Sequence, residues 1–491
     1  GLIMTEMVST ANWSWGTYPG LSHGAMNTVH AWGTPEQKEI YMKPLVSGEW
    51  TGTMCLTESH CGSDLGLMKS KAELNADGSY AITGSKIFIT SGEHDVAGNI
   101  VHIVLARIAG APAGTKGISL FIVPKFLPTE SGAIGERNEV KCGSIEHKMG
   151  MHGSATCVMN FDGAKGWLIG PENKGLNCMF TFMSQMRLAT AMQGVGHAEL
   201  GLQKSVEYAK DRLQMRALGE RKNPEAPADA IIVHPDVRKM LLTQKVFAEG
   251  GRMMCMYLNQ LVDVTEKGSD EAEKENAEAI LALLTPVAKG FLTEVALESA
   301  NFAMQCFGGH GFIKEWGVEQ NVRDCRISTI YEGTTGIQAL DLIGRKALGS
   351  RGKLLMPFSK IVHKFCLEHS DNEVISKFTS PLAELLVEWQ GLTQTLGEKA
   401  MANPEEVGAA SVDYLYITGY LSLAYFWARA ASVAEVKLAD ENCNEKLFYL
   451  AKIQSARFYF ERILPRTKSL TITALSGADN LMTMDEDAFV I

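Results

Sequence analysis

Between about residue 51 and residue 168 the chain consists of short apolar runs separated by Gly and Thr, whereas both flanks carry apolar residues at helical spacing. The runs Lys86–Thr90, Val101–Leu105 and Ile118–Val123 are rich in branched residues and predict strands. Strands segregated from helices in this way are typical of α+β or separate-domain folds, because βαβ units would interleave them. We therefore expect a multidomain α+β protein with a β domain in its middle.

Helical signals surround this β region. Thr34, Pro35 and Gln37 form a capping-box helix start with Pro at the first helical position. A long helix is expected from about Leu176 to Leu213, and His234–Asp236 should open the next one.

Apolar residues at steps of three and four also predict a helix over 270–306. Pro286 should kink this helix or break it into two, since proline removes a backbone donor and clashes with the preceding turn. Gly308–Gly311 should end it sharply. Residues 351–491 are again expected to be mostly helical.

Composition excludes several classes. The net charge of −10 gives no support to nucleic-acid binding, and residues 351–491 hold 14 Lys and Arg against 18 Asp and Glu. The 10 cysteines form no C-x-x-C pair, so neither a metal site nor a disulfide scaffold is expected, and a reducing compartment is favoured. No signal peptide and no uncharged apolar run long enough for a bilayer are found, which predicts a cytoplasmic protein without a membrane partner.

The common catalytic signatures are missing. The chain has no G-x-G-x-x-G between a strand and a helix, no P-loop, no H-E-x-x-H and no nucleophile elbow. A nicotinamide dehydrogenase or a serine hydrolase is therefore disfavoured.

Three segments and one isolated arginine are candidates for chemistry, and each also has an ordinary structural interpretation. Two of the segments and the arginine are described first. Leu56–Asp64 exposes hydroxyls and amides that suit a polar ring edge or a phosphate, or it is a plain polar turn. Gln305–Phe312 has three glycines that let backbone approach a ligand, or it is a glycine-rich helix end. Arg187, in an apolar helix, is a candidate anion ligand, or its head group reaches the surface.

The third segment, Cys325–Gly336, contains Glu332 between an apolar pair and a glycine. A carboxyl group against apolar walls is expected to have a raised pKa, which suits a general base for a carbon acid. Alternatively, Glu332 interacts with the dipole of the helix that follows, which Thr334 or Thr335 could cap.

Taken in order, these segments resemble the acyl-CoA dehydrogenase family. Cys55–Asp64 is similar to its first signature and Lys86–Thr90 to its flavin-facing strand. Gly308–Phe312 and Ile330–Thr334 are similar to its last two signatures. The resemblance runs from about residue 1 to 350 and implies that the family's first helices, roughly a hundred residues, are absent from this sequence.

The resemblance implies the fold and its division. We expect the remainder of an N-terminal helical domain, incomplete here, in residues 1–50, and a middle β-barrel-like domain in 51–168. A C-terminal four-helix bundle should occupy 169–350, and residues 351–491 should form an extra helical extension.

The resemblance also implies FAD as cofactor and assigns residues to it. The expected FAD-binding residues are Met54, Leu56, Thr57, Ser63, Phe88, Thr90, Arg212, Gln214, Gln305, Gly308, Gly309 and Thr334. Thr57 and Ser63 would contact the isoalloxazine or a phosphate, and Thr90 the flavin beside N5. Arg212 and Gln214, with Gln305 and Gly309, would hold the diphosphate and adenine of a neighbouring subunit's FAD.

The implied reaction is α,β-dehydrogenation of an acyl-CoA thioester. Glu332 would remove the α-proton while the β-hydride passes to FAD, and electron-transfer flavoprotein would reoxidise the flavin. Ser184 and Arg187 would contact the CoA portion, with Tyr331 and Gly333 also at the substrate. A homodimer or homotetramer is implied, because family members share FAD between subunits.

Some positions depart from the family pattern. Met54 and Phe88 stand where Tyr and Trp are common, Met215 replaces a common Phe, Gly336 replaces a common Gln, and Cys61 replaces a small residue. These exchanges put individual flavin contacts in doubt more than flavin binding.

The extension resembles that of larger family members. Within these, Cys142–Gly153 and Val233–Val237 are similar to 3-methylmercaptopropionyl-CoA dehydrogenases, which act in dimethylsulfoniopropionate catabolism. The alternatives are a short- to long-chain acyl-CoA dehydrogenase of β-oxidation, an acyl-CoA oxidase, a DNA-associated flavoprotein, and a non-catalytic scaffold of the same fold.

Overall fold

The computed structural model describes residues 1–129 and 131–490. The described residues form two units, one within residues 12–189 and one of residues 1–11 together with 190–490.

Two helices pass from one unit into the other. Helix α1 (Leu2–Trp32) leaves helical geometry at Asn12, where φ is −167° and ψ is 95°, beside the unit boundary. Helix α3 (Gly175–Asp211) crosses the second boundary and agrees closely with the predicted helix.

The unit of residues 12–189 contains a sheet that closes on itself. Strand β4 pairs with β2, β2 with β3, β3 with β9, β9 with β5, and β5 again with β4. The predicted β-barrel-like domain is therefore confirmed. The strands are β1 (Trp50–Cys55), β2 (Lys71–Leu74), β3 (Tyr80–Thr90), β4 (Asn99–Ile108), β5 (Ile118–Pro124), β6 (Phe126–Pro128), β7 (Ile134–Arg137), β8 (Val140–Ile145) and β9 (Thr156–Leu168).

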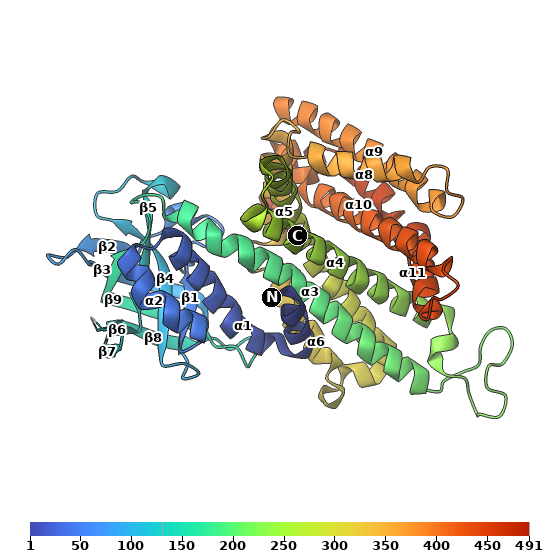
Figure 1. Cartoon of the computed structure of the whole chain (residues 1–491), viewed down its shortest axis with the longest axis horizontal. Helices are drawn as coiled ribbons and strands as arrows, with labels where there is room; N and C mark the ends of the chain where they lie inside the picture. Colours follow the sequence, from blue (N-terminus) through green and yellow to red (C-terminus); the bar gives the residue numbers. More distant parts are fainter. Residues whose placement is uncertain (130, 491) are drawn as a thin grey trace. The chain divides into compact units, whose positions relative to one another are not determined.

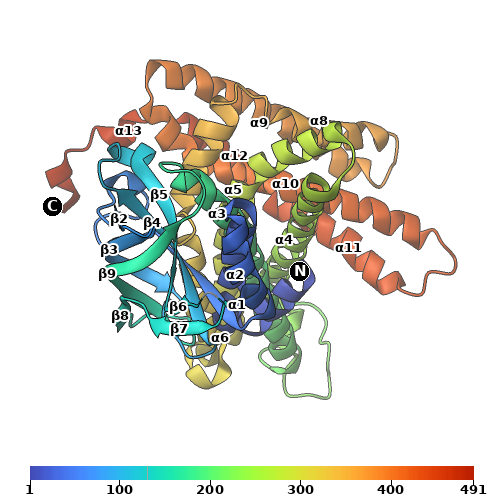
Figure 2. The same ribbon diagram turned by 60° about the vertical axis from the view of Figure 1, so that its left-hand side comes forward.

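Strand β4 shows why this sheet has two cores. Alternate residues of a strand point to opposite faces, and both faces of β4 are apolar. Val101 and Ile103 belong to a cluster with α1 and α2 (Pro35–Ser47), whereas Val104 and Ala106 pack in the cluster on the other face. Figures 1 and 2 show these two helices beside the sheet.

The contact between β1 and α1 requires a glycine. A Cβ on Gly52 would stand 2.3 Å from the Cβ of Ala25, so the strand and the helix approach closely only without it. Helix α2 begins as predicted, since the Thr34 side chain accepts from the Gln37 N–H and the Gln37 side chain accepts from the Thr34 N–H.

The other unit is helical, and α5 and α10 lie at its centre. Helix α10 packs against α4, α5, α7, α9, α11 and α12. Its Trp427 is buried and donates to the Val246 carbonyl in α4 at 3.1 Å. The predicted extension thus shares its core with the bundle. The helices are α4 (Pro235–Lys267), α5 (Glu271–Phe307), α6 (Val318–Arg326), α7 (Thr335–Leu340), α8 (Met356–Glu368), α9 (Ser376–Ala402), α10 (Glu405–Leu438), α11 (Lys446–Phe458), α12 (Arg466–Leu475) and α13 (Asp479–Met482).

A kink or a break was predicted at Pro286, and the break is wrong, because α5 is one helix through this residue. A proline inside a helix costs about 3 kcal/mol in an exposed context. Here Leu283, Leu284 and Val287 around it are fully buried. Burial of these apolar side chains favours the helical conformation and opposes the cost of the lost hydrogen bond.

The stretch Glu271–Phe312 is long and apolar enough to cross a bilayer by length and composition. Its most apolar window is mostly buried inside the fold, which is typical of a core helix.

Candidate active site

The segment around Glu332 is a tight turn between a 3₁₀ turn (Ile327–Thr329) and helix α7. Glu332 has φ of +54° and Gly333 has φ of +86°, so two successive residues are left-handed. Glycine adopts this conformation freely, but a glutamate does so only where its surroundings stabilise it. We call residues 330–334 the base loop, after the base that the sequence predicts at Glu332.

The base loop is held by hydrogen bonds to its backbone. The Gln338 side chain donates to the Glu332 carbonyl at 2.8 Å, and Lys289 of α5 donates to the Gly333 carbonyl. Of the two predicted caps, Thr334 is the one that caps α7, accepting from the Ile337 N–H at 3.2 Å.

Tyr331 is anchored on a buried polar chain. Its hydroxyl donates to the Gln193 side chain of α3. Gln193 in turn lies 3.3 Å from His197, whose other ring nitrogen is 2.7 Å from the Asn321 side chain of α6. Burial lowers the pKa of His197, so its imidazole is neutral near pH 7.

The predicted diphosphate and adenine residues gather around one pocket of about 410 Å³ in the helical unit. It is lined by Tyr208, Arg212, Gln214, Ile231, Gln305, Cys306, Phe307, Gly308, Gly309 and His310. Gly308 has φ of +57°, and no heavy atom lies within 4 Å of the Cβ positions of Gly308 or Gly309. The glycine turn thus leaves open backbone beside one guanidinium and two amide side chains, which suits a flat, anionic ligand.

The loop that follows α3 is organised by Asp229, which the sequence interpretation did not single out. Its carboxylate accepts from the N–H groups of Ala217, Lys222 and Asn223. The Ala217 hydrogen bond is the largest cause of its lowered pKa. The backbone of Gln214 is also paired with Asp229, at 3.0 Å, so this loop is ordered where it lines the pocket.

In the β unit, the strand that was predicted to face the flavin is distorted at Phe88. Pairing of β3 with β9 shifts register between Lys86 and Ile89. Phe88 lies in this bulge with φ of +59°, and its side chain is 60% exposed. A bulge that turns an aromatic ring outward at a positive φ is typical of ligand-contact sites.

A buried ion pair supports this strand and the first signature. Lys86 is fully buried and donates to Glu58 at 2.9 Å and to the Leu56 carbonyl at 3.1 Å. Burial would raise the pKa of Glu58, but Lys86 and the N–H groups of Lys69 and Ser70 lower it to about 2. Glu58 is therefore ionised at neutral pH, and its contact with Lys86 joins loop 56–63 to β3.

The remaining predicted residues have less specific surroundings. Thr57 and Thr90 are half-buried, and Met54 is half-buried on β1, whereas Ser63 is exposed. Ser184 and Arg187 lie three residues apart on α3, and so on one helix face. The β-unit residues and the base loop belong to different units.

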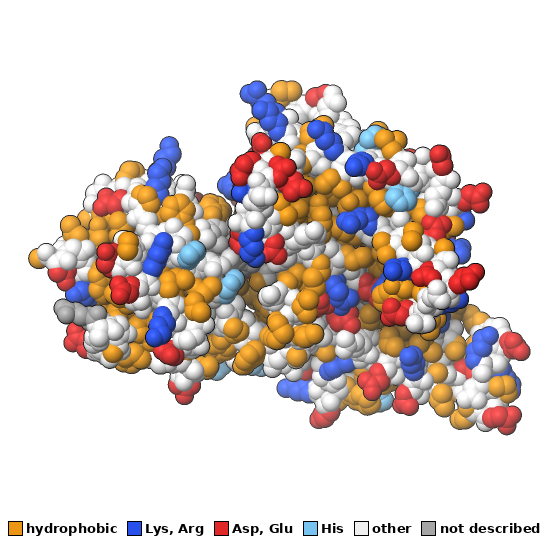
Figure 3. Space-filling model, in the orientation of Figure 1, with side chains coloured by type: hydrophobic (Ala, Val, Ile, Leu, Met, Phe, Trp, Pro, Cys, Tyr) orange, Lys and Arg blue, Asp and Glu red, His pale blue; other side chains and the backbone are white. Residues whose placement is uncertain are grey.

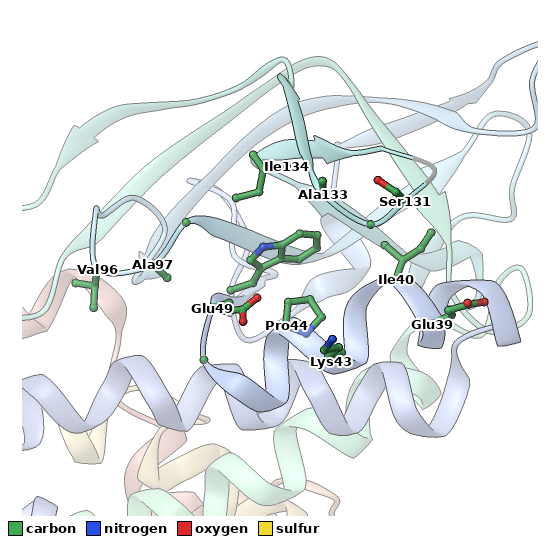
Figure 4. Close-up of a pocket in the computed structure, with 14 residues that line it drawn as sticks. Glu39, Ile40, Lys43, Pro44, Glu49, Val96, Ala97, Ser131, Ala133 and Ile134 are labelled. Atoms are coloured by element: carbon green, nitrogen blue, oxygen red, sulfur yellow. The ribbon is translucent and has the colours of Figure 1, made fainter.

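A second hollow, of about 650 Å³, is lined by none of the residues predicted to bind FAD or substrate or to act in catalysis. It lies in the β unit between α2, the start of β1 and the loops at residues 96–98 and 131–134, with Lys43 and Glu49 beside apolar Ile40 and Pro44 (Figure 4). Among the described residues, Glu58, His60 and Cys61 are close enough together to suit a metal. The Glu58 oxygens already accept from Lys86 and two backbone N–H groups, so this group supports the loop.

Comparison with known families agrees with the fold and the motifs. Residues 53–164 match the acyl-CoA dehydrogenase middle domain, and residues 173–348 match its C-terminal domain. Residues 358–485 match a domain described as acetyl-CoA dehydrogenase C-terminal like.

Two relatives are similar over nearly the whole chain. The chain is 40% identical to 3-methylmercaptopropionyl-CoA dehydrogenase of Ruegeria pomeroyi, over 98% of this chain and 81% of that protein. It is 37% identical to the broad-specificity linear acyl-CoA dehydrogenase FadE5 of Mycobacterium tuberculosis, over 95% and 78%.

Among solved structures, a Bacillus anthracis acyl-CoA dehydrogenase complexed with FAD superposes with a TM-score of 0.77. The superposition covers 100% of this chain and 78% of the Bacillus anthracis protein, and the two sequences are 22% identical over it.

The chain therefore belongs to the acyl-CoA dehydrogenase family. Membership of this family confirms four predictions: the family itself, the fold class, the activity as an acyl-CoA dehydrogenase and FAD as cofactor. The open glycine turn with Arg212 and Gln214 fits an anionic cofactor such as FAD. The sequence interpretation missed Gln193, Lys289 and Gln338 at the base loop. Only Lys289 gave a signal, as a lysine inside an apolar helical run.

Proposed function

We propose that this chain dehydrogenates 3-methylmercaptopropionyl-CoA to 3-methylthioacryloyl-CoA, with Glu332 as the base. The substrate rests on the 40% identity to the Ruegeria pomeroyi enzyme over 98% of this chain. The role of Glu332 rests on its place at the family's Tyr–Glu–Gly position. It is also supported by the left-handed turn there, in which the carbonyls of Glu332 and Gly333 each accept a side-chain hydrogen bond.

The chemistry requires a positioned base. A thioester α-proton is far too weakly acidic to leave unaided, so its removal needs a carboxylate within hydrogen-bond reach and stabilisation of the developing enolate oxygen. Glu332 takes the α-proton, and its backbone N–H donates to the thioester oxygen. FAD held by the residues assigned below would supply the acceptor for the β-hydride, which carries both electrons, while the α-proton goes to Glu332.

We assign FAD binding to two sets of residues. Arg212, Gln214, Gln305, Gly308 and Gly309 hold the diphosphate and adenine of a neighbouring subunit's FAD, which is supported by their convergence on one pocket. Met54, Leu56, Thr57, Ser63, Phe88 and Thr90 face the flavin, and Thr334 touches it near the base. The outward Phe88 at the bulge of β3 supports this second assignment.

Ser184 and Arg187 contact the CoA portion, and Tyr331 and Gly333 line the substrate beside the base. The four-part division at residues 1–50, 51–168, 169–350 and 351–491 also stays a proposal. Helix α10 of the extension packs on α4 and α5 of the bundle, so we expect these two parts to fold together.

We further propose electron-transfer flavoprotein as electron acceptor, a homodimer or homotetramer, and a cytoplasmic location. The first two follow from family membership. The location is supported by the ten cysteines, all of which are free thiols. On the face drawn in Figure 3, Lys and Arg alternate with Asp and Glu and form no basic stripe, so DNA association gains no support.

Anaerobic titration of the FAD-loaded protein with 3-methylmercaptopropionyl-CoA tests the proposal. Flavin absorbance near about 450 nm should bleach rapidly, with butyryl- and palmitoyl-CoA slower. Bleaching that is fastest with a linear acyl-CoA would replace the substrate by that of the alternative, which the 37% identity to FadE5 favours. Rapid peroxide formation during turnover in air would instead indicate an oxidase.

A further inference from the structure

The base loop has a conformation that its own residues do not favour. Glu332 has a side chain at φ of +54°, and Gly333 follows it at φ of +86°. Such backbone persists where contacts from outside the segment hold it in place. The contacts that do so here come from three helices.

Gln193 of α3, Lys289 of α5 and Gln338 of α7 form what we call the polar clamp. All three side chains are 0% exposed. Gln193 accepts from the Tyr331 hydroxyl, Gln338 donates to the Glu332 carbonyl, and Lys289 donates to the Gly333 carbonyl. The clamp therefore contacts the residue before the base, the base itself and the residue after it.

The clamp is itself held in place at two of its members. Gln193 is fixed by His197, and His197 by Asn321, which donates back to the His197 carbonyl at 3.0 Å. Gln338 lies against Gly333, where an added Cβ would stand only 2.5 Å from its Nε2. The amide can thus reach the Glu332 carbonyl because position 333 has no side chain.

We propose that Gln193, Lys289 and Gln338 are positioning residues that present the Glu332 carboxyl to the substrate α-carbon. This rests on the proposed role of Glu332 as base. Proton transfer requires an approach of about 2.6–3.2 Å, and misplacement by about 1 Å costs on the order of 100-fold in rate. A loop released from the clamp would keep its glutamate but lose that approach.

The variants Lys289→Met and Gln338→Leu each remove one donor at similar side-chain size. In anaerobic rapid mixing of FAD-loaded protein with 3-methylmercaptopropionyl-CoA, we expect flavin reduction at saturating substrate to slow by roughly 10- to 100-fold. Substrate affinity and FAD content should stay within about twofold, because neither side chain is assigned to the ligands. An α-deuterated substrate should show a larger isotope effect than with the unaltered protein, since proton removal becomes the slower event.

Ser299→Ala is the matched control. Ser299 is also fully buried in α5, and its hydroxyl donates to the Val295 carbonyl of its own helix at 2.7 Å. It should reduce flavin at the unaltered rate with an unchanged isotope effect.

The outcomes separate the clamp from the base. If Glu332→Gln is inactive while both clamp variants reduce flavin at the unaltered rate, the clamp proposal is overturned and the base stands. If Glu332→Gln itself turns over normally, the proposed function has failed first.

A clamp variant that does not fold is replaced by Tyr331→Phe, which removes only the hydroxyl that Gln193 accepts from. It should slow flavin reduction by about three- to tenfold and raise the isotope effect. The proposal would also be contradicted if flavin reduction slowed only in proportion to a loss of bound FAD, with an unchanged isotope effect.

Discussion

The β unit and the helical unit both place a proposed functional side chain on left-handed backbone, and they stabilise it differently. Phe88 has φ of +59° and Glu332 has φ of +54°. Two residues before Phe88, Lys86 forms a buried ion pair with Glu58, whereas the base loop is held by the polar clamp, of which two members are neutral amides. Because isolated charges are costly to bury and neutral amides less so, the two regions should respond differently to mutation and to pH.

The largest effect is expected at the base. Glu332→Gln keeps the shape and the backbone contacts but cannot accept a proton, so turnover should fall by about 10²- to 10⁴-fold. FAD content, measured by absorbance of the purified protein, should be unchanged. Turnover near the unaltered value would show that another group removes the α-proton.

The next effect tests the ion pair of the β unit. Lys86→Met leaves a buried carboxylate without its cation, which should cost about 3–5 kcal/mol and lower the thermal midpoint by on the order of 10 °C. The control Lys71→Met breaks the exposed Lys71–Glu73 pair, where both side chains are more than half exposed, and should cost less than about 1 kcal/mol. Equal losses in the two variants would mean that burial of the pair is unimportant.

Lowering the pH should reduce the stability of the β unit through its buried ion pair. Glu58 has a folded pKa of about 2 against an ordinary value of 4.5. The stability it contributes is therefore present above about pH 4.5 and is lost as pH falls towards 2, an effect on the order of 3 kcal/mol.

Thermal midpoints measured between about pH 5 and pH 3 should fall more steeply in the unaltered protein than in Glu58→Gln. Parallel curves would show that Glu58 does not titrate with folding.

The smallest effect concerns the base loop backbone. Gly333→Ala introduces a side chain at φ of +86° and against Gln338, so the loop should be destabilised by about 1–3 kcal/mol and turnover should drop roughly tenfold. Gly336→Ala is the control, since its Cβ would meet only Thr334 Oγ1 at 3.9 Å. Steady-state kcat compares the two, and a similar loss in both would argue against the strained turn.

Local sequence signals located the elements well. The capping box at Thr34, the cap at Thr334 and the glycine end of α5 are recognisable because each involves hydrogen bonds or backbone conformations within a few residues. The runs that predicted strands, such as Val101–Leu105 and Ile118–Val123, do lie in β4 and β5. The family's motifs likewise singled out five residues that the structure brings together around the glycine pocket, and the role they predict for Glu332 stays a proposal.

Other features depend on residues far apart in the chain, and no local pattern carries them. The sheet closes through pairing of β4 with β5 as well as through β2, β3 and β9. Helix α5 continues through Pro286 because the surrounding core outweighs the local penalty. Gln193 and Tyr331 are 138 residues apart, yet they share a hydrogen bond. Patterns along the chain thus predicted Glu332 as the base, and long-range burial decided how its loop is held, since buried polar groups find their partners only when the helices pack.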